Sequence, residues 1–304
     1  MSHTHHHGHD HGGGNYNRAF IVSVALNTGF VVIEAVYGIL ANSLALLADA
    51  GHNLSDVLGL LLAWGATILA RRRPTARRTY GLRRSSILAA LLNAAFLLVV
   101  SGGIGWEAIQ RFREPASVAG GTVIVVAAIG IAINTVSALM FLSGRKSDLN
   151  IRGAFLHLVA DAAVSVGVVL AGIAIIATGW LWFDPAVSLI VTVVIVAGTW
   201  QLFQESLNLI TDAVPAGIEP LTVRTYLAEL PGVTGVHDLH IWAMSTTETA
   251  LTVHLVMPTG FPGDAFLVQV TQELHARFGI EHTTLQVETG DPSYPCPLAG
   301  GNLV

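Results

Sequence analysis

The stretch 44-LALLADAGHNLSDVLGLLLAW-64 is apolar enough to cross a membrane, yet it carries Asp49, His52 and Asp56. A bilayer-spanning helix needs about 20 predominantly apolar residues, and this segment has that length. Ionisable groups in hydrocarbon cost at least about 2.5–3.5 kcal/mol each on insertion scales, so they normally face a partner, a cavity or a bound ion. The stretch therefore predicts a functional site inside a membrane helix.

The composition of the whole chain also indicates a membrane protein. Of its 304 residues, 52% are hydrophobic and only 12% are charged, whereas soluble domains are roughly 25% charged. The mean hydropathy is +0.62. The net charge of -5 is small and the basic residues are clustered, so no nucleic-acid partner is expected. A single cysteine, Cys296, excludes an intramolecular disulfide and any Cys₄ or Cys₂His₂ zinc site.

Six runs are long enough to cross a bilayer. They cover residues 19–40, 44–70, 87–109, 122–142, 154–177 and 185–209. Residues 1–17 are polar and rich in histidine, where a cleavable leader needs a basic start and an apolar centre. We therefore expect the first run to be retained as a spanning helix.

Basic residues indicate how the runs are oriented. They are Arg71, Arg72, Arg73, Arg77, Arg78, Arg83 and Arg84 between the second and third runs, and Arg145, Lys146 and Arg152 between the fourth and fifth. The positive-inside rule places both connections in the cytoplasm, and with six spans both termini are then cytoplasmic. The loop 71–86 is interpreted as a topology determinant that contacts anionic membrane lipids.

After residue 211 the apolar stretches shrink to strand length. We expect a helix at 219–230, strands at 235–243 and 250–256, a helix at 263–278 and a strand at 283–288. The predicted protein is thus an α-helical membrane protein, with six transmembrane helices in residues 18–211. A small cytoplasmic α+β domain follows in residues 212–290, with a three-stranded sheet and two helices, for regulation or dimerisation. A flexible leader (1–17) and a flexible tail (291–304) flank these parts.

One motif, H-x-x-x-D, occurs on two membrane runs, as His52 and Asp56 and as His157 and Asp161. Residues four apart lie on one face of a helix. If the two helices pack together, two imidazoles and two carboxylates converge, which suits a tetrahedral divalent cation such as Zn²⁺. Asp49 shares the face of His52. The sequence leaves open whether Asp49 lines an aqueous path or makes a structural hydrogen bond.

Two further polar features lie outside this constellation. Glu34 and Glu107 are expected near water at the ends of their spans. The leader contains six histidines: His3, His5, His6, His7, His9 and His11. An affinity tag is one interpretation, but the interleaved glycine and aspartate favour a metal-gathering segment that is disordered without metal.

The string S-L-A-L-L-A-D-A-G-H-N-L-S-D at 43–56, the second H-x-x-x-D and 236-VHDLHIWAM-244 resemble the cation diffusion facilitator family. The chain is most similar to bacterial cobalt-zinc-cadmium resistance exporters and eukaryotic zinc transporters. The resemblance implies a homodimer in a bacterial inner (cell) membrane, exporting divalent metal from the cytoplasm in exchange for protons. The resemblance also implies that the transport site is formed by His52, Asp56, His157 and Asp161. The histidine at 52 resembles the zinc-favouring version, and the D-x-x-x-D pairs usual in manganese transporters do not occur at these positions.

The ligand types predict how transport is driven. Metal ligands must be deprotonated, so metal binding releases protons and protonation expels metal. Histidine titrates near neutral pH, which predicts an antiporter that moves Zn²⁺ out and H⁺ in, with Cd²⁺ and Co²⁺ able to use the same ligands. A passive metal channel or a sensor is the alternative. An intramembrane zinc hydrolase would need an open ligand position and a general base, which four filled positions do not offer, so we expect a transporter and not an enzyme.

The cytoplasmic domain contains residues for a second metal site, which the sequence does not decide. The resemblance carries regulatory zinc binding onto His237 and His254, but the histidine and aspartate of relatives on the last strand are Gln286 and Glu288 here. On a regular strand, His237 and His240 would point to opposite faces. Two interpretations remain: a regulatory metal held by His237, His254 and Glu288, or polar contacts that stabilise the fold.

Overall fold

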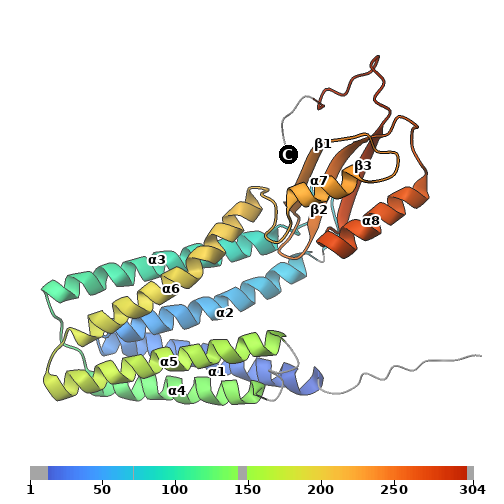
Figure 1. Ribbon diagram of the computed structural model, residues 1–304. Helices are drawn as coiled ribbons and strands as arrows, with labels where there is room; N and C mark the ends of the chain where they lie inside the picture. The colour runs from blue at the N-terminus through green and yellow to red at the C-terminus, as the bar shows by residue number, and fades with distance from the viewer. Residues whose placement is uncertain (1–12, 71, 143–148, 300–304) are drawn as a thin grey trace, which may run out of the picture. The chain divides into compact units, whose positions relative to one another are not determined.

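The computed structural model describes residues 13–70, 72–142 and 149–299, which form long helices followed by a mixed α/β region (Figure 1). The long helices are α1 (Gly13–Leu40), α2 (Leu44–Ala70), α3 (Ser85–Arg113), α4 (Gly120–Phe141), α5 (Leu149–Thr178) and α6 (Phe183–Ile210). Within the described residues, all of these except α2 are long and apolar enough to cross a membrane. The remaining helix, α2, has 27 residues and contains Asp49, His52 and Asp56. The predicted class, an α-helical membrane protein with six long helices and an α+β domain, is confirmed.

The described parts of the chain form two compact units. One comprises residues 1–60 and 94–200, and the other comprises residues 61–93 and 201–304. Both H-x-x-x-D pairs belong to the first unit, and the sheet belongs to the second. The histidine-rich stretch at 3–11 lies outside the described residues.

In the first unit, α1, α4 and α5 pack side by side (Figure 1). Small residues allow this close approach, as is usual between membrane helices. A Cβ at Gly172 of α5 would lie 2.7 Å from Ile124 Cγ1 and 3.2 Å from the Gly120 carbonyl oxygen of α4. A Cβ at Gly130 of α4 would lie 2.6 Å from Phe30 Cζ of α1. These contacts fix the position of α5, which carries His157 and Asp161.

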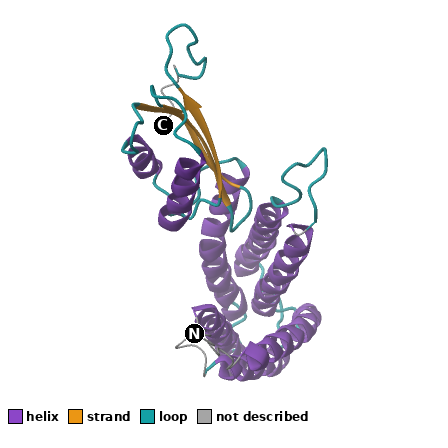
Figure 2. Cartoon of the chain, turned by 90° about the vertical axis from the view of Figure 1, so that its right-hand side faces the viewer, coloured by secondary structure: helices purple, strands orange, loops and turns teal. Residues whose placement is uncertain are grey.

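The second unit contains a three-stranded sheet in the order β1 (Gly235–Ala243), β2 (Thr249–Val256), β3 (His282–Glu288). The β1–β2 pair is antiparallel and the β2–β3 pair is parallel. The helices α7 (Pro220–Ala228) and α8 (Asp264–Phe278) pack on one face of the sheet (Figure 2). That face buries Leu251, Val253 and Leu255 of β2. Because side chains alternate along a strand, His254 lies on the opposite face.

A β-bulge interrupts β1 at Asp238. His237 pairs with His254 and His240 pairs with Thr252, so β1 has one residue more than β2 between these pairs. Asp238 adopts a φ of 52°, in the left-handed region. The expectation that His237 and His240 point to opposite faces is wrong, because the extra residue of a bulge returns the second side chain to the first face.

Two arginines of the loop between α2 and α3 make ion pairs within the second unit. Arg83 Nη1 lies 3.1 Å from Glu248 Oε2, and Arg84 pairs with Asp212. The Thr246 N–H also donates to Ser86 Oγ at 3.1 Å. Exposed ion pairs contribute little stability each, about 0–1 kcal/mol. Arg83 and Arg84 thus pair with carboxylates of the protein, whereas the sequence predicted contact of this loop with lipids.

Close packing at Gly172 yields a prediction. The Gly172→Ala substitution should destabilise the bundle by about 1–3 kcal/mol, because the new methyl meets Ile124 and the backbone of α4. The matched control is Gly167→Ala on the same helix, where an added Cβ meets nothing within 4 Å. Thermal unfolding in detergent should show a lower Tm for Gly172→Ala only. Equal Tm values for the two variants would contradict the packing.

Candidate metal centre

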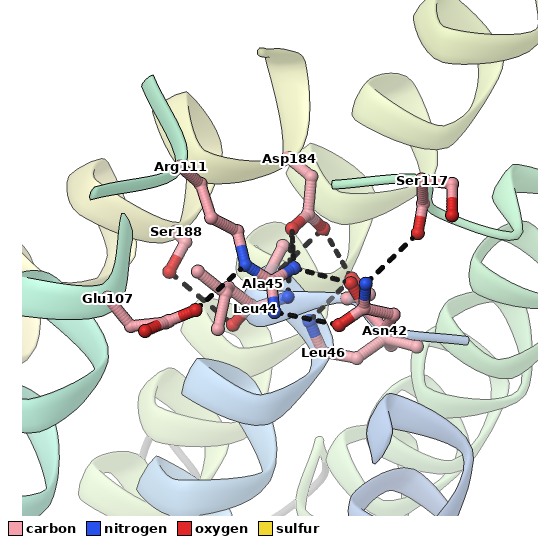
Figure 3. Close-up of polar contacts among 10 residues, drawn as sticks. Asn42, Leu44, Ala45, Leu46, Glu107, Arg111, Ser117, Asp184 and Ser188 are labelled. Carbon is pink, nitrogen blue, oxygen red and sulfur yellow. Dashed lines mark hydrogen bonds and ion pairs between the residues drawn. The ribbon is translucent and has the colours of Figure 1, made fainter. Parts of the chain in front are cut away.

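The first turn of α2 is capped by a side chain from α6. Asp184 is 1% exposed and accepts hydrogen bonds from the Leu44 N–H at 2.8 Å and the Ala45 N–H at 3.4 Å. The Ser43 hydroxyl also donates to Asp184 (Figure 3). The first N–H groups of a helix lack partners within the helix, and a carboxylate there also complements the helix dipole. Asp184 thus fixes the end of the helix that carries His52 and Asp56.

Arg111 of α3 extends this anchor. Its Nη1 lies 3.9 Å from Asp184 Oδ2 and donates to the Asn42 carbonyl oxygen at 2.6 Å, while Nη2 donates to Asn42 Oδ1 at 2.8 Å (Figure 3). Glu107, one turn earlier on α3, accepts from Arg111 Nε at 3.3 Å. The network joins α3 and α6 to the α1–α2 turn, so two neighbouring helices hold the start of α2.

The structure brings the two H-x-x-x-D pairs together. His52 Nε2 lies 3.4 Å from Asp161 Oδ1 on the other helix and 3.7 Å from Asp56 Oδ2 on its own. His157 Nε2 lies 3.2 Å from Asp56 Oδ2 and 3.6 Å from Asp161 Oδ2. Each imidazole therefore faces both carboxylates. The side chain of Asp161 is 5% exposed, whereas that of His157 is 46% exposed, so one side of the cluster is accessible.

These separations fit a tetrahedral ion. Ligand atoms about 2.0–2.1 Å from a Zn²⁺ ion at tetrahedral angles lie about 3.3 Å from one another. The four nitrogen–oxygen distances run from 3.2 to 3.7 Å. Two carboxylates would also balance the charge of one divalent ion. One ligand atom from each of His52, Asp56 and Asp161 falls within 4.8 Å of the others, so these three can hold a divalent cation. A movement of the His157 side chain, whose Nε2 lies 3.2 Å from Asp56 Oδ2, would add the fourth ligand.

Two buried carboxyl groups lie beside this cluster. Asp49 is 0% exposed, and its Oδ2 accepts from Ser165 Oγ at 3.0 Å. Glu34 of α1 is also 0% exposed, and its Oε2 accepts from Asn53 Nδ2 at 3.1 Å. The expectation that Glu34 sits near water is wrong, because its side chain is fully buried and points to Asn53 of α2.

A second cluster of metal-ligand type lies in the cytoplasmic domain, on the sheet face opposite α7 and α8. His254 Nδ1 lies 2.7 Å from Glu288 Oε1, and His237 Nε2 lies 3.4 Å from Glu288 Oε2. Cys296 Sγ lies 3.5 Å from His254 Nδ1. One ligand atom from each of these four residues falls within 4.8 Å of the others. Gln286 does not join them as a ligand but donates to Glu288 Oε1 at 2.9 Å.

Sequence reasoning missed Cys296 because residues 291–304 were expected to be a flexible tail. In the structure, a turn at Asp291 brings the chain back towards β2, with the Ser293 N–H donating to Asp291 Oδ1 at 2.8 Å. The available signal was a lone thiol eight residues after Glu288. Desolvation tends to raise the pKa of Glu288, but the hydrogen bonds from Cys296 and Gln286 and the nearby imidazoles outweigh it and lower the pKa.

Comparison with known proteins gives a consistent result. A family model described as "Cation efflux transmembrane domain" matches residues 20–211, and one described as "Cation efflux protein, cytoplasmic domain" matches residues 215–290. The "Cadmium, cobalt and zinc/H(+)-K(+) antiporter" of Bacillus velezensis is 38% identical, over 93% of this chain and 92% of that protein. The "Metal cation efflux system protein CzcD" of Cupriavidus metallidurans is 38% identical, over 96% and 92%. The "Zinc transporter ZitB" of Escherichia coli is 37% identical, over 95% and 93%.

The cap on α2 yields a prediction. The Asp184→Ala substitution leaves the hydroxyl of Ser43 and the N–H groups of Leu44 and Ala45 without their acceptor, which should cost about 1–3 kcal/mol. The control, Asp184→Asn, keeps one acceptor oxygen and should lose less. Thermal unfolding should rank wild type above Asp184→Asn and Asp184→Asn above Asp184→Ala. A wild-type Tm in Asp184→Ala would show that the cap does not stabilise α2.

Proposed function

Because the chain belongs to the cation efflux family and is a transporter, not an enzyme, we propose that it exports Zn²⁺ from the cytoplasm in exchange for protons. The observation that carries this proposal is the convergence of His52, Asp56, His157 and Asp161 between two apolar helices. Each imidazole Nε2 lies 3.2–3.7 Å from an oxygen of both carboxylates, close to the nitrogen–oxygen edges of a zinc-sized tetrahedron. In this proposal Zn²⁺ is the transported substrate at these four side chains.

The same donor set provides the coupling. Both imidazoles must lose their protons and both carboxylates must be ionised before a metal ion binds. Protons that arrive from outside occupy the imidazoles and so release the ion. The site has no thiolate among its four donors, so it binds zinc less tightly than a Cys₄ cage and can release it.

Metal choice follows the donors and agrees with the relatives. The names of the three relatives above refer to zinc, cadmium, cobalt or metal cations in general. We propose Zn²⁺ as the main substrate of this chain, with Cd²⁺ and Co²⁺ carried by the same ligands. Mn²⁺ prefers carboxylate and water ligands, so two imidazoles disfavour it.

The protein is an integral membrane protein, and its setting in the cell is proposed from the same reasoning. We propose that both termini lie in the cytoplasm of a bacterial cell and that the chain lies in the inner membrane, with its loop arginines near lipid headgroups; the arginine-rich loops support this orientation. We propose a homodimer, held in part by the cytoplasmic domain. The leader histidines would gather metal for the site. Our alternative function, a passive channel or sensor, differs in needing no proton gradient.

The transport site gives the first test. In proteoliposomes containing the full chain, a pH gradient alone should drive Zn²⁺ uptake, and Asp56→Ala or Asp161→Ala should abolish it, because each removes a ligand and one of the two balancing charges. The control is Glu114→Ala, at an exposed carboxylate in the α3–α4 connection. Zinc flux at the wild-type rate in either aspartate variant would contradict the assignment of the transport site.

The same assay separates the alternatives. Zn²⁺ flux that does not depend on the pH gradient would indicate a channel. Mn²⁺ flux equal to Zn²⁺ flux would contradict the proposed selectivity.

The cytoplasmic cluster gives the second test. We propose that His237, His254, Glu288 and Cys296 hold a regulatory metal ion. Co²⁺ bound by a thiolate shows a sulfur-to-metal charge-transfer band in the near ultraviolet. The wild type loaded with Co²⁺ should show this band, Cys296→Ser should lose it, and the control His240→Ala should keep it. Absence of the band in the wild type would leave these side chains as contacts that only stabilise the fold.

A further inference from the structure

Glu34 and Asp49 are buried carboxyl groups that the transport site does not use. Both are 0% exposed, one on α1 and the other on α2. Each has one satisfied oxygen: Asn53 Nδ2 donates to Glu34 Oε2 at 3.1 Å, and Ser165 Oγ donates to Asp49 Oδ2 at 3.0 Å. The surrounding side chains thus supply one donor to each carboxyl group.

The remaining oxygen of each carboxyl group is unpaired. Glu34 Oε1 and Asp49 Oδ1 are buried, and no hydrogen-bond donor reaches them from the described part of the chain. Asn53, the donor to Glu34, follows Asp49 by four residues on α2, so the Glu34 carboxyl group lies beside the helix face that carries Asp49. Two ionised carboxylates cannot hydrogen-bond, and burying both charges side by side is costly, so such pairs share one proton. A single proton between Glu34 and Asp49 would give each unpaired oxygen a partner.

The pair lies close to the four metal ligands but is distinct from them. Asp49 precedes His52 by three residues on α2, which is about 4.5 Å along the helix axis. Ser165, which holds Asp49, follows Asp161 by four residues on α5. The pair is therefore about one helical turn nearer the start of α2 than the metal cluster is. In the proposed topology that is the outer side, from which protons enter.

We propose that Glu34 and Asp49 form a second proton-binding site, which carries one of the protons exchanged for each metal ion. This inference rests on the proposed function and adds a named carrier to it. With the transport site empty, one proton is shared by the two carboxyl groups. When a divalent ion binds one turn away, its charge favours ionisation of both groups: the O–H bond breaks and the proton passes to water on the cytoplasmic side. Release of the metal lets the pair take a proton from outside.

Few charged groups compete for this role. Among the described residues, His52 of α2 and Asp161 of α5 are the ionisable neighbours with the largest electrostatic effect on the pair. The neighbouring helix α4, residues Gly120–Phe141, contains no titratable residue in its sequence. The charge at the metal cluster therefore affects proton binding by the pair, and the charge of the pair affects metal binding.

The direct test counts protons released when zinc binds. The full-length protein in detergent is titrated with Zn²⁺ by calorimetry in buffers of different ionisation enthalpy, which gives the number of protons released per metal ion. In Glu34→Gln and Asp49→Asn the new amide supplies a permanent N–H donor to the facing oxygen, so the contact is kept while the exchangeable proton is lost. Each variant should release about one proton fewer per Zn²⁺ than the wild type. The matched control is Glu114→Gln, which should release as many protons as the wild type.

A second measurement starts from the wild type, whose own spectrum does not depend on the folding of a variant. Infrared difference spectra on zinc binding should show loss of the C=O band of a protonated carboxylic acid, and this loss should be missing in Glu34→Gln. Absence of the band in the wild type, or unchanged proton release in both variants, would overturn the inference. The inference also predicts that K⁺ takes no part in the exchange: replacing K⁺ by choline should leave the number of protons released by the wild type unchanged. A change in that number would overturn the inference.

These outcomes are separable from failure of the proposed function. If the wild type exchanges Zn²⁺ for protons but both variants release as many protons as the wild type, only the proposal of a second proton-binding site is wrong. If the wild type moves no Zn²⁺ in response to a pH gradient, the proposed antiport is wrong, whatever the calorimetry shows.

Discussion

The fold depends on one electrostatic constraint: four ionisable side chains face one another inside a bundle of apolar helices. Charges in such surroundings persist only when they are paired, hydrated or bound to an ion. His52, Asp56, His157 and Asp161 meet this requirement as a set, because each imidazole faces both carboxylates. A bound divalent ion or a set of protons can each satisfy the cluster. That equivalence is the physical basis of exchange between metal and protons.

The helix α2 carries most of this chemistry, and its neighbours are arranged around it. Asp184 and Arg111 hold its first turn, so Asp49, His52 and Asp56 follow at fixed positions along the axis. The approach of α5 to α4 at Gly172 places the other half of the cluster. Small residues and one buried cap therefore decide where the charged groups meet, although neither is itself a ligand.

Much of this arrangement could be predicted from the sequence. Apolar runs of membrane length predicted the helices, and the repeated His-x-x-x-Asp spacing predicted which side chains share a face, because both signals are local and periodic. The inward turn of Glu34 was not predictable in this way. An acidic residue near the end of an apolar run is usually near water, whereas here tertiary packing buries Glu34 and brings it to Asn53 of α2. The bulge at Asp238 and the return of Cys296 likewise depend on contacts between distant segments, which no local pattern encodes.

Coordination of one metal ion by two histidines and two aspartates between α2 and α5 can be measured directly. X-ray absorption at the zinc edge would be recorded on full-length protein that carries His237→Ala, His254→Ala and Cys296→Ser, has alanine in place of the six leader histidines, and is loaded with one equivalent of Zn²⁺. These substitutions remove the imidazole and thiol donors outside the membrane helices, so the signal reports the membrane site. The account predicts four nitrogen and oxygen ligands at about 2.0–2.1 Å, with the outer-shell scattering of two imidazoles. A six-coordinate ion, or one without imidazole scattering, would contradict it.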